Sequence, residues 1–442
     1  MLTEEGPAIG GGTATRPARK RPRLSRSEWV LLLVLAGMQF LHIVDFVIVM
    51  PLGPKLQDSL NIDVGQFGWF VSAYGFSACA TGLFAARLLD RFDRKKSQLL
   101  LFVGFTVGTL LCAVAPNFPV LMLARAVAGA FAGVMGANVL AIVSDVFPES
   151  RRATAMGVVM SSFSVASIVG IFAGLEIAEA WGWRGPFLVL AVLCVPALLV
   201  AWRVLPPLRR HLERRPARAA GLIEILLQPR HLRAYALTAA LMMGSWTIIP
   251  FLAIFLVSNL HWAETSVKWV WVVGGVATLL TMTPTGWVAD SRDKLLVFRV
   301  IGVFCVVPVL LVTNLSPDSP VALTLLATTL FMVVTSIRWV PGMAMISASA
   351  APHQRGSFMS VNASVQQMVM GLAPLVSGLI LGQKAEGNAG RPLEGYALVG
   401  LLAAASMFAS VLLAGRLRRA PAQQQGPHAR EAVAEPAEVA AF

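Results

Sequence analysis

The sequence predicts an all-α membrane protein with twelve transmembrane helices arranged as two sets of six. Of its 442 residues, 56% are hydrophobic and 13% are charged, and the mean hydropathy of +0.71 is too high for an ordinary soluble chain. Apolar runs of about 20 residues, the length that crosses a bilayer, recur along the chain. A charged loop at 90–96 also returns at 290–294, and two such loops at corresponding places indicate an internal duplication.

The first half, which we place at residues 28–205, contains six apolar runs. Residues 1–27 precede it and are rich in Gly, Pro, Arg and Lys, so we expect a disordered cytoplasmic tail that cannot bury an apolar face. The first run is longer than a signal-peptide core and lacks a small-residue cleavage site, so we expect it to be retained as a spanning helix. The six runs are 29–50, 66–86, 97–114, 119–144, 153–178 and 185–204.

The second half, residues 234–416, repeats this arrangement. A basic, proline-containing linker at 206–233 separates the two halves, and we expect it to be cytoplasmic. Residues 417–442 have no periodicity and are expected to form a second disordered tail. The six runs of this half are 234–257, 267–289, 295–312, 321–347, 357–381 and 393–414.

Basic residues indicate the orientation in the membrane. Arg and Lys cluster in the tail 1–27, in the linker and in every second connection, whereas the other connections contain few. Because basic loops remain in the cytoplasm, we expect a multi-pass protein of the cell (inner) membrane with both termini cytoplasmic. The same rule accounts for the net charge of +13, so we expect no nucleic-acid partner.

Metal, cofactor and enzyme motifs are missing from the sequence. The four cysteines lie inside apolar runs, without the spacing of a metal site or of a disulfide framework. The sequence contains no nucleophile elbow, phosphate loop or metalloprotease motif. We therefore expect neither metal nor cofactor, and a membrane enzyme or sensor is the least favoured of three interpretations.

The charged loop carries a family resemblance. It matches the signature G-x-L-x-D-R-x-G-R-K at Asp90, Arg91, Arg94 and Lys95, and it departs from the signature at Ala86 and Asp93. The second copy keeps Gly286 and Asp290. With two six-helix sets joined by a basic linker, residues 29–416 resemble the major facilitator superfamily. The resemblance implies two pseudo-symmetric six-helix bundles, the major facilitator fold, in a monomer that moves a small-molecule substrate and protons across the lipid bilayer by alternating access.

The charged loops are candidates for a cytoplasmic gate. An aspartate at the end of one helix stabilises the positive N-terminus of another by ~0.3–1 kcal/mol, so it could latch the two halves together. The resemblance also places this loop in the inner gate. The alternative is that these charges only set the topology. The gate candidates are Asp90, Arg91, Arg94, Lys95, Asp145, Arg151, Arg152, Gly286, Asp290, Arg292 and Arg355.

Two charges inside the first half are candidates for proton coupling. From the rise of a helix, Asp45 lies ~10–13 Å below the outer surface in the first run, and Arg125 lies ~9–10 Å deep in the fourth. A carboxylate beside a guanidinium stays ionised until something competes for its partner, so Asp45 could carry a proton. His42, one turn deeper on the same helical face, could extend the site. The alternative is a structural ion pair that joins the first helix to the fourth.

Both positions resemble motifs of the drug:proton antiporters within the superfamily. Asp45 is followed nine residues later by Pro54, as in that group's first-helix motif, although a further proline intervenes here. Arg125 with Gly129 and Gly133 is similar to the fourth-helix motif, which the resemblance links to proton transfer.

The fifth run departs from the antiporter pattern. Antiporters of the family carry Gly-Pro followed by further glycines at this place, whereas this chain has Gly170 and Gly174 without the proline. We expect this pair of small residues, like Gly129 and Gly133, to allow close helix packing.

A substrate cavity is predicted from polar and aromatic residues inside both halves. Arg338 lies within the tenth run with no acid at similar depth, so it must find carbonyls, water or an anionic ligand, unless it snorkels toward the cytoplasm. Glu176, near the outer end of the fifth run, could contribute to the cavity or be interfacial. The cavity candidates are Arg338, Asn138, Trp246, Asn362, Gln366 and Glu176.

Two interpretations as a transporter remain open. In the first, the protein exports a small amphiphilic drug or metabolite in exchange for protons. In the second, which Arg338 favours, it imports or exchanges a small organic anion. The substrate itself depends on which side chains converge in three dimensions.

Overall fold

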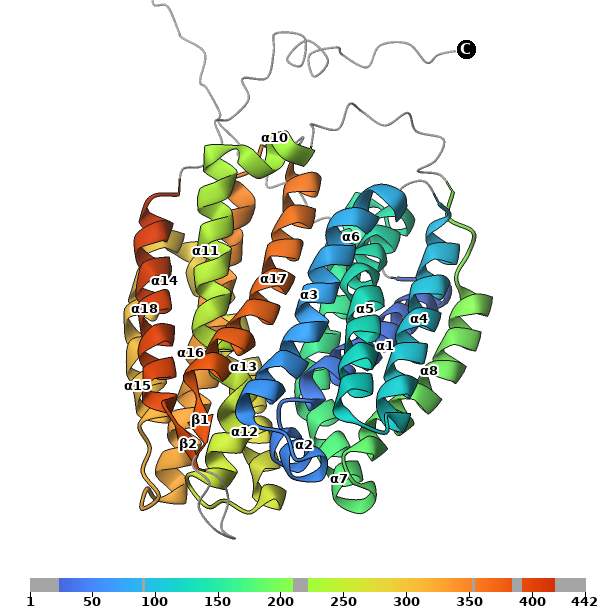
Figure 1. Cartoon of the computed structure of the whole chain (residues 1–442). Helices are drawn as coiled ribbons and strands as arrows, with labels where there is room; N and C mark the ends of the chain where they lie inside the picture. Colours follow the sequence, from blue (N-terminus) through green and yellow to red (C-terminus); the bar gives the residue numbers. More distant parts are fainter. Residues whose placement is uncertain (1–23, 90–91, 210–221, 352–353, 384–391, 418–442) are drawn as a thin grey trace, which may run out of the picture.

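The structure, a computed structural model, describes residues 24–89, 92–209, 222–351, 354–383 and 392–417, and it consists almost entirely of helices (Figure 1). Within these residues, eleven helices are long and apolar enough to cross a membrane. The apolar helix α3 (Val64–Leu89), with 26 residues, completes the twelve. The predicted twelve-helix fold is confirmed. Asp90 and Arg91 of the charged loop lie outside the described residues.

Some long helices of the first half begin at residues whose side chains cap them. The side chain of Ser25 forms a capping box with Glu28 at the start of α1. Asn117, whose backbone is extended like that of Ser25, caps α5. The elements of this half are α1 (Arg26–Ile48), α2 (Gly53–Leu60), α3, α4 (Arg94–Val114), α5 (Phe118–Val146), α6 (Glu149–Val165), the π-helical turn η1 (Ala166–Gly170), α7 (Ile171–Trp181) and α8 (Arg184–Val204).

The second half repeats the long helices and adds a short strand pair. In that pair Gly382 lies opposite Glu394 and Gln383 opposite Leu393, in antiparallel register. The elements are α10 (Leu222–Leu227), α11 (Pro229–Trp246), α12 (Ile249–Ser258), α13 (Glu264–Ser291), α14 (Lys294–Phe304), α15 (Val306–Thr313), α16 (Val321–Ala348), α17 (Arg355–Ile380), β1 (Gly382–Gln383), β2 (Leu393–Glu394) and α18 (Tyr396–Gly415).

The two halves lie side by side, with α1 to α8 in one and α10 to α18 in the other (Figure 1). Helix α2 and the β1–β2 pair lie at one end of the molecule, which we call the hairpin end. Helix α10 lies at the opposite end, which we call the terminal end because α1 begins there and α18 finishes there.

Glycines allow α3 and α17 to approach closely where the halves meet. A Cβ atom added at Gly75 would lie 2.7 Å from the Cα of Gly371, and one added at Gly68 would lie 2.8 Å from the carbonyl oxygen of Pro374. Distances this short leave no room for a side chain, and small residues at such crossings give membrane helices their van der Waals contact. These glycines therefore hold the two halves together along this line.

We expect Gly75→Ala to destabilise the contact between the halves, because the added methyl group would collide with the backbone of α17. The loss should be about 1–3 kcal/mol of unfolding free energy, the usual cost of overpacking. Gly157→Ala in α6 is the control, since a Cβ atom there meets nothing within 4 Å. That substitution should be neutral or stabilising by roughly 0.5–1 kcal/mol. Thermal unfolding of both variants in detergent measures the difference, and equal melting temperatures would contradict it.

Four features of the fold were not predicted from hydropathy. The short elements α2, α10 and β1–β2 are too brief to register as spans. Helix α2 begins with Pro54 in its first turn and ends at Asn61, whose φ of 50° is left-handed. The predicted run 153–178 contains the π-helical turn η1, which lies where Gly170 faces Val44 of α1.

Candidate functional site

A buried ion pair joins α1, α4 and α5 inside the first half. The Nη1 atom of Arg125 lies 2.7 Å from Oδ2 of Asp45 and 3.3 Å from its backbone oxygen. The hydroxyl of Thr109 on α4 donates to Oδ1 at 3.2 Å. The side chains of Asp45 and Arg125 are 0% and 1% exposed. Asp45 lies on the last turns of α1, where consecutive residues are all buried, and Arg125 lies on the inward face of α5, one turn after Leu121.

Aromatic rings of α3 cover the guanidinium. The Cζ atom of Arg125 lies 4.5 Å from the centroid of the Tyr74 ring and 5.7 Å from that of Phe70. Such contacts are stronger in a desolvated site than at a surface. The hydroxyl of Tyr74 and Nε of Arg125 have no hydrogen-bond partner among the described residues. The site therefore keeps polar capacity beyond the ion pair itself.

His42 lies near this pair without contacting it directly. Its ring packs edge-on against Phe105 of α4, with the centroids 6.2 Å apart, and its Nδ1 atom has no partner among the described residues. Phe105 and Thr109 both belong to α4, and Phe105 lies one turn before Thr109. The ring of His42 therefore packs on α4 one turn closer to the terminal end than the carboxylate of Asp45 does. It is positioned to extend the site only through an intermediate group.

The predicted cavity residues do not gather in one place. Asn138 is buried within the first half, where its amide donates to the backbone oxygen of Arg94 and to Gln98. The amide oxygen of Asn362 accepts from Thr238 inside the second half. Trp246 packs against Phe46 at 5.3 Å between ring centroids, which brings α11 against α1. Gln366 is half-buried on α17.

Arg338 is held inside the second half by neutral acceptors. Its Nη2 atom donates to the backbone oxygen of Leu241 at 3.2 Å, and Nη1 donates to the hydroxyl of Ser410 at 3.4 Å. The side chain is fully buried, and none of the ion pairs in the described part of the chain includes it. The guanidinium is therefore directed toward α11 and α18, within its own bundle.

Where gate candidates form ion pairs in the described part of the chain, the partners lie within the same half. Nε of Arg94 lies 2.5 Å from Asp145, Arg151 pairs with Glu28 at 2.7 Å, and Arg152 donates to the backbone oxygen of Ser144. The backbone N–H of Lys95 donates to Asp93. Asp290 lies 3.6 Å from Lys294 on the same helix. Gly286 has open space beside it, and Arg292 and Arg355 are exposed. The latch at Asp90 remains a prediction, because that residue is outside the described ranges.

A polar network at the hairpin end joins the two halves. Lys268 of α13 pairs with Glu176 and lies 3.4 Å from Glu179, both on α7. Lys55 of α2 lies 3.6 Å from Glu264 of α13. The amide oxygen of Gln383 on β1 accepts from Gln57 of α2 and from the N–H of Val64. We name these pairs the hairpin-end network.

Sequence reasoning missed most of these residues. Lys55 and Lys268 lie in connections that contain few basic residues, and nothing in the sequence pairs them with acids more than 80 positions away. Thr109 and Tyr74 also gave no signal, because an apolar helix does not show which of its faces is turned inward.

Comparison with known proteins gives a consistent result. Two regions, residues 35–244 and 234–441, match the family model described as Major Facilitator Superfamily. A crystal structure of a bacterial homolog to the human lysosomal transporter Spinster, in an inward-facing and unoccupied conformation, shares the fold, with a TM-score of 0.68 and 16% sequence identity. The match covers 90% of this chain and 100% of that one.

Two curated relatives each match less than half of the chain. The "Uncharacterized MFS-type transporter Rv1250" of Mycobacterium tuberculosis is 32% identical over 43% of this chain and 33% of its own length. The "Multidrug resistance protein fnx1" of Schizosaccharomyces pombe is 31% identical over 42% of this chain and 35% of its own length. The chain thus spans about a third of the length of these two relatives.

Proposed function

Because this chain belongs to the Major Facilitator Superfamily, we propose that it is a proton-coupled exporter of a small amphiphilic drug or metabolite, working by alternating access. The family consists of transporters rather than enzymes. The observation that carries the proposal is the fully buried ion pair of Asp45 and Arg125, which connects three helices of one half. The name of the multidrug resistance relative supports the choice of substrate class.

The proton acts by competing with Arg125 for the carboxylate of Asp45. A proton on Asp45 removes its charge, weakens the 2.7 Å contact with Nη1, and loosens the link between α1 and α5. The guanidinium then relies on the ring of Tyr74 and on neutral acceptors. Loss of the proton on the other side of the membrane restores the pair, so proton movement and rearrangement of the helices are coupled.

In this proposal the protein lies in the cell membrane, and its terminal end faces the cytoplasm because the connections at that end contain most of the basic residues. The hairpin end then faces outward. Its network of Lys268 with Glu176 and of Lys55 with Glu264 closes the outer side between the halves. An exporter must break these contacts in order to release substrate outward.

Reversing one charge of the hairpin-end network should open the outer side, and reversing both partners should close it again. We expect Lys268→Glu to shift the equilibrium between the closed and the open outer side by about 1 kcal/mol toward the open form, since partly exposed ion pairs contribute on that scale. The double variant Lys268→Glu, Glu176→Lys restores opposite charges between these two positions, although position 268 then faces Glu179 with a like charge. The measurement is the distance between spin labels on Asp58→Cys and Asp318→Cys, exposed positions at this end in the two halves. An unchanged distance distribution in the single variant would contradict the closure.

Vesicles containing the purified protein test the function itself. An imposed pH gradient should drive a lipophilic cationic dye against its own gradient, and dissipating the pH gradient should stop this movement. Dye binding without movement would reject transport. Movement that ignores the pH gradient would reject proton coupling.

The second candidate is uptake or exchange of a small organic anion. It is favoured by Arg338, whose buried guanidinium contacts only the neutral groups of Leu241 and Ser410 within the described residues. In the same vesicles, an anionic dye that moves with protons, while the cationic dye does not, would select this candidate.

A further inference from the structure

The third spanning helix of each half begins in the same way. Asp93 precedes α4, and its Oδ1 accepts from the N–H of Lys95 at 2.9 Å. Asp293 precedes α14, and its Oδ1 accepts from the N–H of Leu295 at 3.2 Å. The duplicated halves therefore place a capping carboxylate at corresponding points of the terminal end.

In the first half, the chain that leaves α8 covers this cap. The N–H of Leu208 donates to Asp93, and the backbone oxygen of Leu208 accepts from the N–H of Arg94, each at 3.3 Å. Nε of Arg209 lies 3.1 Å from Oδ2 of Asp93, whose side chain is 7% exposed. Burial alone would raise the pKa of Asp93, but these donors outweigh it and hold the pKa below its ordinary value.

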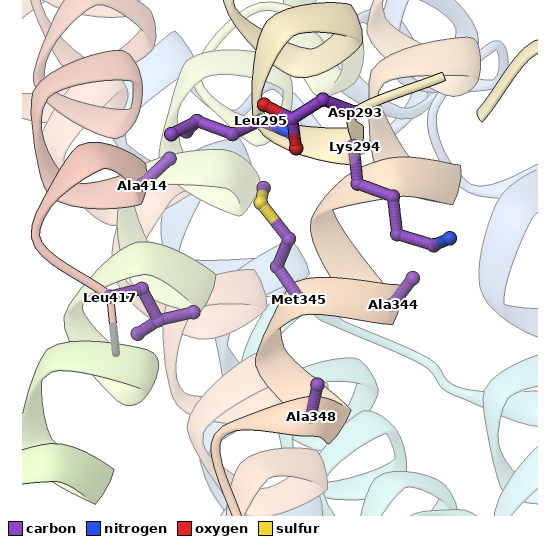
Figure 2. A pocket seen from close by; sticks show the side chains of 8 residues that line it. All are labelled: Asp293, Lys294, Leu295, Ala344, Met345, Ala348, Ala414 and Leu417. Atoms are coloured by element: carbon purple, nitrogen blue, oxygen red, sulfur yellow. The ribbon is translucent and has the colours of Figure 1, made fainter. Parts of the chain in front are cut away.

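In the second half, the corresponding place is a hollow of about 440 Å³ (Figure 2). Asp293 is exposed at its edge, with Oδ2 unpaired among the described residues. The last turns of α16 present Ala344, Met345 and Ala348, whereas α5 ends with the ion-paired Asp145. The hollow thus combines an apolar wall with the free oxygen of Asp293 and with Lys294, whose Nζ atom lies 3.6 Å from Asp290.

The sequence that follows each last helix is also repeated. Leu208 is followed by Arg209 and another arginine, and Leu417 is followed by Arg418 and another arginine. Leu417 itself lines the hollow, as Figure 2 shows. The chain therefore continues from the wall of the hollow with the same residue types that cover the cap of α4.

We propose that the hollow is a docking site for the segment that begins at Arg418, and that Arg418 pairs with Asp293 as Arg209 pairs with Asp93. Asp293 and Arg418 have opposite charges, Lys294 of the lining already lies 3.6 Å from Asp290, and Leu417 brings the chain to the site. The docked segment ties together α14, α16 and α18, whose residues form the hollow. The cap of α14 is then covered as the cap of α4 is, independently of which substrate the protein carries.

Disulfide cross-linking in the full-length protein tests this docking. The native cysteines of the described residues are all buried, so introduced pairs dominate the reaction. The pair Asp293→Cys, Arg418→Cys should form a disulfide under mild oxidation, at a rate close to that of Asp93→Cys, Arg209→Cys, which places cysteines at positions already in contact. Both pairs lose a helix cap, so they are matched in that respect.

Two further pairs determine whether docking is specific. Asp290→Cys, Arg418→Cys uses a carboxylate position that is 82% exposed and only three residues before Asp293. This pair should react roughly tenfold more slowly, because docking raises the effective concentration of the cysteine at 418 only beside position 293. Ala344→Cys, Arg418→Cys keeps the cap of α14 intact and should react like the Asp293 pair. Equal rates at positions 290 and 293, or failure of both the 293 and 344 pairs to react, would overturn the proposal.

Discussion

Asp45→Asn is expected to abolish transport driven by a pH gradient while leaving a folded protein that still binds substrate. The amide cannot exchange a proton at neutral pH, so the competition between proton and guanidinium for this side chain disappears. Its oxygen can still accept from Arg125, and Nη1 of Arg125 also keeps the backbone oxygen of Asp45 at 3.3 Å. Flux in vesicles should fall to the level of empty vesicles.

The fold itself indicates that this substitution is tolerated. After Asp45→Asn, Arg125 is a buried guanidinium with neutral acceptors only, which is the situation of Arg338 in the other half. Binding of the dye, measured by fluorescence quenching without a pH gradient, should therefore persist. Asp318→Asn, an exposed position at the hairpin end, is the matched control and should transport normally. Full proton-driven transport by the Asp45 variant would remove Asp45 from the coupling role.

The fold could be predicted from the sequence because one physical constraint determines it. A helix must present about 20 apolar residues to cross the bilayer, so length and hydropathy locate the spans. The duplicated loop then orders them into two halves. The same constraint gave the equal depths of Asp45 and Arg125, and the structure brings these two side chains together.

Rotation of the helices about their axes could not be predicted. The depth of a residue follows from its position along the helix. A helix that is apolar on all sides, however, has no polar face to show which side is turned toward the cavity. Arg338 illustrates this, because the sequence suggested a substrate contact and the structure directs the side chain to Leu241 and Ser410. Asn138 is a second example, because the sequence suggested that it lines the cavity and its amide donates to Gln98 inside the first half. The hairpin-end network depends on contacts between halves, which only the assembled fold defines.

Arg125→Leu should be far more damaging to folding than Asp45→Asn. It leaves the carboxylate of Asp45 at 0% exposure with only the hydroxyl of Thr109 as a donor. Removing one partner of a buried ion pair costs about 3–5 kcal/mol, since the remaining charge stays desolvated. We expect low yield and a strongly reduced melting temperature in detergent. Arg292→Leu, which removes an exposed arginine, is the control and should leave the melting temperature unchanged.

The double variant Asp45→Asn, Arg125→Leu distinguishes a lost ion pair from lost packing. If the damage comes from the unpaired carboxylate, removing its charge should recover most of the stability that Arg125→Leu loses. The coupling energy of the double-mutant cycle should then be roughly 0.5–3 kcal/mol. Recovered stability should not bring back proton-driven flux, because the exchangeable carboxylate is absent. If the double variant is no more stable than Arg125→Leu alone, the guanidinium acts mainly by filling the space beside Tyr74 and Phe70, and the electrostatic account of this site fails.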